Sequence, residues 1–475
     1  MPIQKLPLAK GLGKDYRNAD YVDLLPVNML ATPKEVLNAS GYLRSFPGVA
    51  KRSDVAGVSR GVEYNTVQNI PYRVAGGKIY RGGNERGNVS GDKRVSMAHS
   101  ATSQAVAANG IMTLYRYDGT NKTLQNWPPN VGGTDFSQYD IGSVRDICRA
   151  RGRYVWVKDG TQTFGVTDLE DESHPDRFRP FYTAESQPDG IIGCGVWRDF
   201  VVMFGSSTIE YFSLTGAADA SAAIYVAQPS LMVQKGIAGT YCKAEFMDSF
   251  AFISHQSTGA PSIYMINNGQ ASQIATATVE KVLRSYTADE LATGVLESIR
   301  FDSHELLIAH LPRHVLCYDA TASQSGPQWC ILKTGLFDGV HRSIDYVFEG
   351  NQVTVGDKLE AVTGALKFDS SAQYDKQQEH ILYSPLIKVD NVLINDLELD
   401  TSGGVCDRIE RIFISATTDG INYGREQMVV LQAPFIYDNR VLWRRVGRVR
   451  RLIGFKFRII AKGPVTLSDL SFRIT

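Results

Sequence analysis

Short strand-like runs joined by tight turns recur through most of this chain, and this repetition limits what it can fold into. In the clearest unit, within 197–214, the apolar run 200–204, the break Gly205-Ser206 and a second apolar run form a β-hairpin pattern. A single hairpin is marginally stable in water, so repeated hairpins must bury their faces against neighbours. Looser copies of the unit lie at 71–80, 103–115, 153–166, 249–266, 305–319 and 343–355.

The spacing of these hairpins indicates how they are arranged. Their turns are separated by roughly 35 to 55 residues, which is the length expected of a four-stranded propeller blade. We therefore predict an all-β fold with a β-propeller of six or seven blades. The spacing is irregular and no single signature residue recurs, so the blade count stays open. The alternative is an ordinary all-β chain of sandwiches, whose hairpins also repeat, and the blade-like spacing favours the propeller over it.

One stretch inside the repeats breaks the β pattern. Within 274–299, Thr287 and Glu290 are spaced as a capping box, with Leu291, Val295 and Ile299 on a following apolar helix face. We expect one or two short helical insertions between blades there.

The composition changes at both ends of the repeats. Residues 1–50 are rich in Pro and Gly and do not repeat. They predict an extended arm lying on another surface or, equally, an irregular wrap over the chain's own propeller. Residues 51–370 are the predicted propeller. After a polar boundary near 369–379, residues 371–475 contain about six strand-like runs, which predict a β-sandwich of jelly-roll type.

Charge and cysteine usage give few hints of a partner. The chain has 50 basic and 50 acidic residues in a total of 475, so its overall balance favours neither a nucleic acid nor a membrane. The six cysteines form no CxxC pair, which favours free buried thiols made in a reducing compartment. There is no signal-peptide pattern and no apolar run long enough for a transmembrane helix. We expect synthesis in the cytoplasm.

Motifs for catalysis or cofactor binding are not found in the sequence, so we predict no enzyme activity, no catalytic residue, no cofactor and no metal site. His304, His310 and His314 lie close together in the sequence, but they span a probable turn and lack a carboxylate pattern. The acidic stretch 168–176 lacks the order of a calcium-binding loop. We interpret it as a solvated loop.

Two stretches are candidate interfaces. The sequence from 440 to 458 alternates arginine with apolar residues, and in a strand this alternation would place many of the arginines on one face. Such a face could contact phosphates, pair with a neighbouring subunit or be solvated; overall neutrality favours a protein interface. In the Pro-rich arm, the apolar segment 21–33 is the second candidate. The candidate interface residues are Arg444, Arg445, Arg448, Arg450, Arg451, Tyr21, Leu24 and Leu25.

Several long stretches resemble a known family. The segments at 10–21, 25–35, 41–48, 168–177, 204–216 and 228–239 are similar to the packaged-DNA-stabilisation proteins of short-tailed lambdoid phages that infect enteric bacteria, also called tail accessory factors or tail hubs. The similarity extends over essentially the whole chain.

This resemblance implies a structural protein of the virion tail with no small-molecule substrate. In that family, six copies form a ring below the portal and its adaptor protein. The ring extends the channel through which double-stranded DNA passes without sequence-specific binding, and it helps to retain packaged DNA. It carries the trimeric tailspikes and receives the tail needle.

A function from a different class remains open on the residues alone. Propellers can also bind or cleave carbohydrates, and a glycosidase would use paired carboxylates. Such a protein would need a pocket with exposed aromatic side chains beside those carboxylates.

Overall fold

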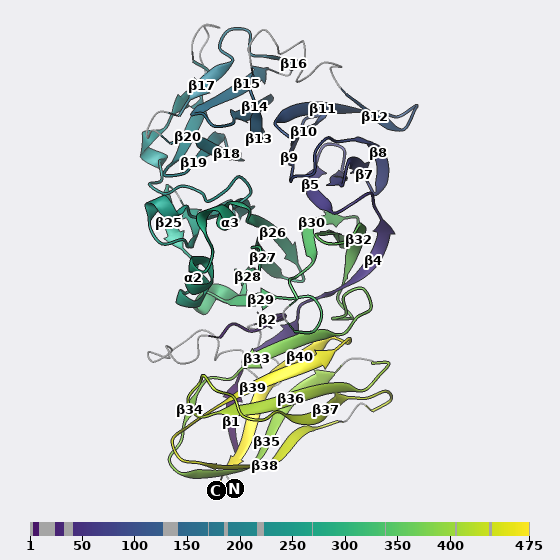
Figure 1. Cartoon of the computed structure of the whole chain (residues 1–475), viewed down its shortest axis with the longest axis vertical. Helices are drawn as coiled ribbons and strands as arrows, with labels where there is room; N and C mark the ends of the chain where they lie inside the picture. The colour runs from purple at the N-terminus through teal and green to yellow at the C-terminus, as the bar shows by residue number, and fades with distance from the viewer. Residues whose placement is uncertain are drawn as a thin grey trace.

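The structure is a computed structural model that describes residues 3–8, 24–32, 41–126, 141–169, 171–184, 189–215, 223–267, 269–337, 339–403, 406–436 and 439–474. These residues form a ring of small antiparallel sheets with a second β body attached to its rim (Figure 1). The predicted all-β fold, a propeller followed by a sandwich, is confirmed.

Seven sheets of four or five strands follow one another around the ring, so the propeller has seven blades. The first strand of each blade lies nearest the axis (Figure 1). Blades 1 to 3 contain β5 (Ser59–Asn65), β6 (Ile70–Ala75), β7 (Lys78–Arg81) and β8 (Asn84–Asn88); β9 (Ser96–His99), β10 (Gln104–Ala108), β11 (Ile111–Asp118) and β12 (Thr123–Asn126); and β13 (Val144–Ala150), β14 (Arg153–Lys158), β15 (Thr163–Asp168), β16 (Asp171–Pro175) and β17 (Phe181–Thr183). Blades 4 to 6 contain β18 (Ile191–Trp197), β19 (Phe200–Gly205), β20 (Ile209–Leu214) and β21 (Tyr225–Ala227); β22 (Lys243–Phe246), β23 (Ser249–Ile253), β24 (Ile263–Asn267) and β25 (Gln270–Gln273); and β26 (Val295–Phe301), β27 (His304–His310), β28 (Val315–Asp319) and β29 (Trp329–Leu332).

Blade 7 closes the ring with strands from the two ends of the propeller sequence. It contains β30 (Ser343–Glu349), β31 (Gln352–Asp357) and β32 (Val362–Lys367), and its outermost strand is β4 (Gly48–Asp54). In the β4–β32 pair, Val49 lies opposite Leu366. A strand that precedes blade 1 in the sequence therefore completes the last blade, which joins the ring without a covalent bond.

The helical insertion between blades 5 and 6 is shorter than predicted. It consists of α2 (Ala277–Arg284) and α3 (Ala288–Ala292), and the Thr287–Glu290 capping box is present. The predicted apolar helix face through Val295 and Ile299 is wrong, because both residues belong to the inner strand β26. In β26 the exposed Arg300 lies between the buried Ile299 and Phe301, which is the alternation of a half-buried strand. Short 3-10 turns lie at Pro229–Leu231, Gln256–Thr258 and Ala322–Ser325.

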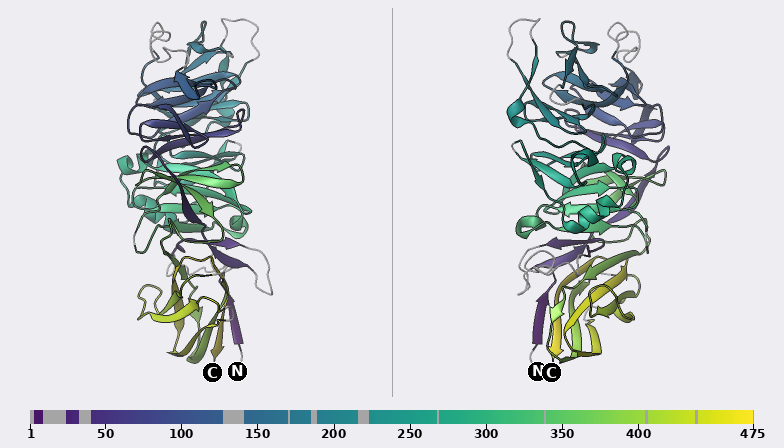
Figure 2. Two further views of the ribbon diagram at one scale, coloured as in Figure 1. Left: turned by 90° about the vertical axis from the view of Figure 1, so that its right-hand side faces the viewer. Right: turned by 60° about the vertical axis from the view of Figure 1, so that its left-hand side comes forward.

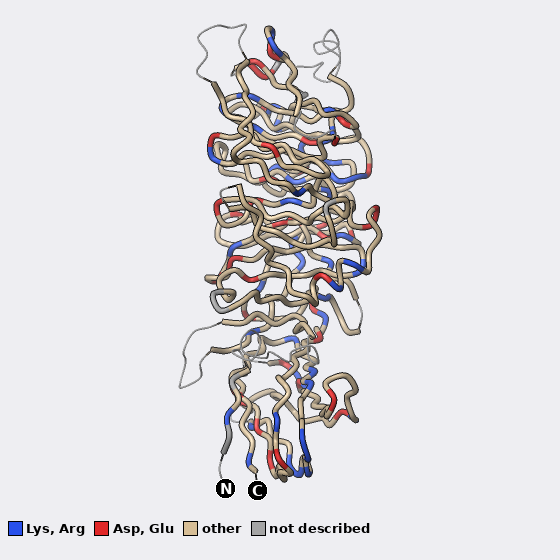
Figure 3. Tube along the Cα trace, turned by 90° about the vertical axis from the view of Figure 1, so that its left-hand side faces the viewer, with Lys and Arg blue, Asp and Glu red and all other residues tan. Residues whose placement is uncertain are grey.

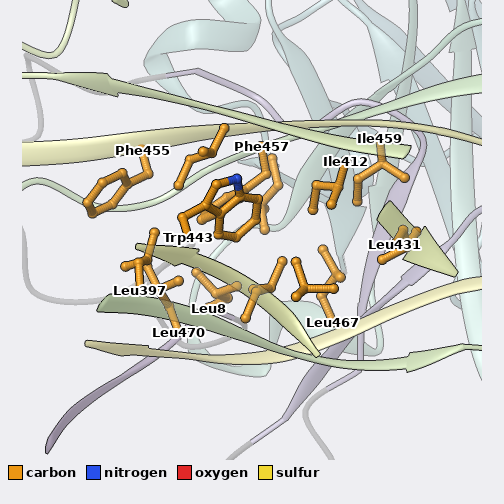
Figure 4. Close-up of a cluster of buried hydrophobic side chains, with 14 of the residues drawn as sticks. Leu8, Leu397, Ile412, Leu431, Trp443, Phe455, Phe457, Ile459, Leu467 and Leu470 are labelled. Carbon is orange, nitrogen blue, oxygen red and sulfur yellow. The ribbon is translucent and has the colours of Figure 1, made fainter. Parts of the chain in front are cut away.

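The second body is a sandwich of two antiparallel sheets around one apolar cluster (Figure 4). Trp443, Phe455 and Phe457 are among its largest buried side chains. One sheet contains β1 (Ile3–Pro7), β2 (Met29–Thr32), β3 (Tyr42–Ser45), β40 (Val465–Ile474), β35 (Val392–Gly403) and β38 (Val441–Val449); the other contains β33 (Gln378–Tyr383), β34 (Ile387–Lys388), β39 (Leu452–Ala461), β36 (Glu410–Thr417) and β37 (Gln427–Gln432).

The described parts of the N-terminal segment contact both bodies. β1 pairs with β40 over its whole length, and β3 pairs with the other end of β40. Between them, Val27 forms a bridge with Ile331 of blade 6. The N- and C-terminal ends of the chain consequently lie together at the end of the sandwich farthest from the propeller (Figure 2). The propeller sequence is thus inserted between strands of the sandwich.

Asn28, just before β2, joins the two bodies. Its side-chain Nδ2 donates to the Glu379 carbonyl oxygen of the sandwich at 2.8 Å, and its Oδ1 accepts from the Lys333 backbone N–H of the propeller at 2.8 Å. Its own backbone N–H donates to the carbonyl oxygen of Ile331 in blade 6. Because Asn28 is 3% exposed, these buried hydrogen bonds have no competing water, and they fix the sandwich relative to blade 6.

Candidate interaction surfaces

Five of the candidate interface arginines are exposed along one edge of the sandwich. Arg444, Arg445 and Arg448 belong to β38, the edge strand of its sheet, and Arg450 and Arg451 form the turn into β39. We call these five residues the arginine edge. Basic and acidic segments lie side by side at this end of the molecule (Figure 3).

The arginine edge makes few contacts within the chain. Arg448 Nε donates to Asn391 Oδ1 at 3.0 Å, whereas the other four form no ion pair with another described residue. Their neighbour Arg440 differs, because it forms two hydrogen bonds of 2.6 Å with Glu398. These bonds lower the pKa of the Glu398 carboxyl group. The four arginines are therefore free to pair with a partner.

A bulge modifies the predicted alternation. Arg445 has a φ of 58°, and the register between β35 and β38 shifts between Ile394 and Asp396. Consecutive residues Arg444 and Arg445 are both exposed as a result. A bulge of this kind also prevents an edge strand from pairing with another sheet, so the edge offers side chains to a partner in place of backbone groups.

The apolar candidates of the N-terminal segment have different positions. Tyr21 lies outside the described residues. Leu24 is 42% exposed. Leu25 is half-buried and packs against the cluster between blades 5 and 6, so the contact that it makes is within its own propeller.

A funnel that the sequence did not indicate opens on the propeller axis. Two adjoining cavities of about 510 and 400 Å³ share Val196 and Glu245 in their walls. The surrounding protein shields the Glu245 carboxyl group from water, and this desolvation raises its pKa. The first strand of every blade contributes to the walls, through Glu63, His99, Arg149, Val196, Glu245, Arg300 and Phe348.

The aromatic residues of the funnel bear on the carbohydrate alternative. Trp197 is not an open stacking surface: the Arg198 guanidinium lies 4.7 Å from its ring centre, and Phe200 stacks on it with centroids 5.8 Å apart. Its Nε1 donates to the Asp248 carbonyl oxygen at 2.7 Å. Phe348 is 54% exposed. The funnel therefore has one accessible ring, in a wall of mixed charge.

Buried ion pairs cross the ring at the inner end of the funnel. Arg94, which precedes blade 2, pairs with Asp345 of blade 7, and Lys243 of blade 5 pairs with Asp146 of blade 3 at 2.8 Å. The Tyr241 hydroxyl donates to the Arg94 carbonyl oxygen at 3.0 Å, which joins opposite sides of the ring. We call these five residues the axial network. Their contacts cross the ring at this level.

Within the axial network, the charged partners shift the pKa values of Asp345 and Lys243. Burial alone would raise the pKa of Asp345, but the guanidinium groups of Arg94 and Arg73 hold it below its usual value. The Asp146 carboxylate likewise raises the pKa of Lys243 against the effect of burial. The lowered pKa of Asp345 and the raised pKa of Lys243 both favour the charged forms of these two groups.

The structure does not bring the three histidines together. His304 Nδ1 lies 2.6 Å from Asp319 Oδ2, His310 hydrogen-bonds Glu297, and His314 Nδ1 lies 2.7 Å from the Tyr286 hydroxyl. Across the described ranges, no group of three or more His, Cys, Asp or Glu residues could hold a metal ion.

The acidic stretch is only partly the solvated loop that we predicted. Much of it forms β16, and two of its carboxylates are buried. Glu172 accepts hydrogen bonds from the hydroxyls of Thr102 and Ser103, at 3.1 and 3.0 Å. Asp176 accepts from Arg153 Nη1 at 2.7 Å. Glu172 therefore links blade 3 to blade 2, and Asp176 links parts of blade 3 to each other.

Comparison with known proteins matches both bodies of the molecule. The family model for the bacteriophage P22 Gp10 β-propeller matches residues 4–371, and that for the bacteriophage P22 Gp10 β-sandwich matches residues 379–475. The chain belongs to the P22 Gp10 family. Its relative in Salmonella phage P22, the tail hub protein gp10, is 68% identical over 474 residues, which cover 100% of both chains. The resemblance found in the sequence is thereby confirmed.

Two solved structures show only a distant similarity to this chain. The extracellular domain of a hybrid two-component system from B. thetaiotaomicron aligns with a TM-score of 0.43 and 8% identity, over 74% of this chain and 43% of that one. A protein from Lactobacillus plantarum gives a TM-score of 0.34 and 10% identity, over 75% of this chain and 91% of that one. In the part of the chain that the structure describes, no helix is long and apolar enough to cross a membrane.

Proposed function

We propose that this protein is the structural hub of a short phage tail and has no enzymatic activity. Six copies form a ring below the portal and its adaptor protein, extend the DNA channel and help to retain the packaged DNA. The ring carries trimeric tailspikes and receives the tail needle. The protein is made in the host cytoplasm and ends in the virion. The observation that carries this proposal is the 68% identity with a tail hub protein over the full length of both chains.

The axial network bears on where the DNA would run. Tyr241, Arg94 and their ion-paired neighbours join opposite blades, so a duplex has no passage along the axis of one propeller. The channel of the assembled hub is therefore a lumen between subunits. Its diameter depends on how many copies surround it.

Such a ring suits a neutral chain. Neighbouring subunits in a cyclic hexamer meet through two different faces, so opposite charges can pair across each contact while each chain stays neutral. The chain carries 50 basic and 50 acidic residues. A strongly basic lumen would bind phosphates and slow the exit of DNA, and the neutral balance avoids this.

Light scattering tests the proposal. The free protein is expected at the mass of one chain, 52.4 kDa, or as a reversible oligomer. Mixed with a purified portal–adaptor assembly, it should add the mass of six chains. A mixture in which the added protein stays at its free mass would refute the hub for that assembly. Binding of glycans by the axial funnel would then become the function to test.

A further inference from the structure

Two cysteines of blade 6 face each other across neighbouring strands. Cys317 on β28 lies directly opposite Cys330 on β29 in the antiparallel register. Residues in this relation have Cα atoms about 4.5 to 5.5 Å apart, with both side chains on the same face of the sheet. A disulfide requires Cα atoms about 4.4 to 6.8 Å apart. The backbone of the reduced protein therefore already has the spacing of a cross-strand disulfide.

Both thiols are buried among apolar side chains. Cys317 is 1% and Cys330 3% exposed, in the apolar cluster between blades 6 and 7. That cluster includes Val49 of the ring-closing strand β4 and Leu30 of β2. A small cavity of about 10 Å³ is lined by both cysteines.

The other cysteines make the contrast clear. Cys242 is buried alone, and its Sγ lies 3.2 Å from the Leu291 carbonyl oxygen and 3.3 Å from that of Gly294. Cys148 and Cys194 are neighbours, but they come from different blades and are not strand partners. The Cys317–Cys330 pair alone stands in direct register among the paired strands that the structure describes.

We propose that Cys317 and Cys330 are a modification site: they form an intramolecular disulfide when the protein meets low-molecular-weight disulfides outside a reducing cytoplasm. One thiolate attacks a sulfur atom of oxidised glutathione, forming a mixed disulfide and releasing one glutathione. The second thiolate then attacks the protein-bound sulfur and releases the other glutathione. Two protein thiols are oxidised and one external disulfide is reduced, and the two protons lost by the cysteines pass to the two departing glutathione thiolates.

The disulfide would form slowly. It would connect β28 to β29 in blade 6, next to the ring-closing strand β4. Burial raises the pKa of the Cys317 thiol well above its usual value, so little thiolate is present at neutral pH. Reaction therefore requires local opening of β29, the outermost strand of the blade, and becomes faster as the pH rises. The inference concerns blade 6 alone and does not depend on the hub function.

Peptide mapping tests the proposal on the unmodified full chain. The protein is incubated with oxidised glutathione at neutral and at alkaline pH. It is then unfolded in denaturant that contains a thiol-alkylating reagent and digested with trypsin. No Lys or Arg lies between His314 and Lys333, so one tryptic peptide carries both cysteines. We expect this peptide to be two hydrogens lighter and unalkylated, sooner at alkaline pH. If both of its cysteines are alkylated or carry glutathione, or if Cys148 and Cys194 are linked in their place, the proposal is overturned.

Variants test whether the bond strengthens the fold. In the wild type we expect oxidation to raise the thermal midpoint by about 4 °C. The rise should vanish in Cys317→Ala and persist in Cys242→Ala, each compared with its own reduced form. If Cys317→Ala does not fold, Cys330→Ser serves instead. An equal rise in a variant that lacks one of the paired cysteines would contradict the proposal.

Discussion

The propeller and the sandwich place their charged groups in opposite ways. At the centre of the propeller, Asp146 and Asp345 are 2% and 1% exposed and pair with cations from other blades. The cluster between the two sheets of the sandwich is apolar, and the five residues of the arginine edge are exposed.

This difference suggests a division of roles. Apolar contacts between blades are non-directional, whereas a buried ion pair forms only in one geometry and is costly to break. The axial network can therefore fix how the blades meet at the axis. The main core of the sandwich is apolar, and the unpaired arginines at its edge are available for contacts with other molecules.

The largest expected effect is the difference in unfolding free energy lost when a buried or an exposed carboxylate is removed. Asp146→Ala should cost about 3 to 5 kcal/mol of unfolding free energy, because it leaves Lys243 charged and buried. Its matched control is Asp396→Ala, whose partner Arg473 is 3.8 Å away on the exposed surface of the sandwich. That change should cost less than about 1 kcal/mol. Urea unfolding followed by tryptophan fluorescence measures both, and equal losses would contradict the comparison.

The connection between the two bodies comes next. Asn28→Gly should cost about 1 to 3 kcal/mol, because the Glu379 carbonyl and the Lys333 N–H lose their buried partner. Glycine keeps the φ of 55° at this position, so backbone strain is not added. In calorimetry, we expect the unfolding transitions of the propeller and the sandwich to be separated by a wider temperature interval than in the wild type.

The same substitution at a hairpin turn provides the control. Asn109 has a φ of 52° and an exposed side chain. Asn109→Gly should therefore change the unfolding free energy by less than about 0.5 kcal/mol. Identical calorimetric profiles for the two glycine variants would show that Asn28 does not couple the bodies.

The polar centre of the propeller should also make stability depend on pH. Burial, and then the charge of Asp345, raise the pKa of Glu297 from 4.5 to about 8. The folded protein therefore holds a proton that the unfolded chain releases, and the stability gained from it is lost as the pH rises through about 8. Burial lowers the pKa values of His310 and His341, so these histidines change the stability only below pH 6.5. Burial also lowers the pKa of Lys358 to about 8, so this lysine changes the stability only above pH 8.

The window between pH 6.5 and 8 consequently isolates Glu297. We expect the urea midpoint of the wild type to fall across this window and that of Glu297→Gln to stay level, because glutamine cannot release a proton. A fall of the same size in the variant would assign the pH dependence to another group.

How much of this fold the sequence predicts depends on the distance between partners. The hairpins of second and third strands, such as β19–β20, were predictable because the turn and both strands lie within about fifteen residues. The β4–β32 and β1–β40 pairs were not, since their partners are hundreds of residues apart and the N-terminal strands are short. The error at 295–301 arose because apolar residues four apart fit a helix face as well as alternate positions in a strand.

The candidate sites divide in the same way. Exposure of the arginine edge followed from its charge, whereas the bulge at Arg445 depends on pairing with β35. The axial network could not be found from spacing, because Arg94, Tyr241 and Asp345 come from three blades. Only the closed ring brings them together.

The smallest expected effect on stability tests the other half of the comparison. The double change Arg450→Ala and Arg451→Ala removes two exposed side chains without an ion pair among the described residues, so the unfolding free energy should change by less than about 0.5 kcal/mol. If the edge is an interface, the same variant should add fewer copies to the portal–adaptor assembly in light scattering, and binding by the wild type should weaken with added salt.

Arg440→Ala is the matched control, because this arginine is also exposed but is already bonded to Glu398. It should assemble like the wild type. If Arg440→Ala and the double variant lose assembly equally, the effect comes from the charge of the sandwich as a whole. If neither loses it, the arginine edge is a solvated surface, and the contacts of the sandwich must be sought on its other faces.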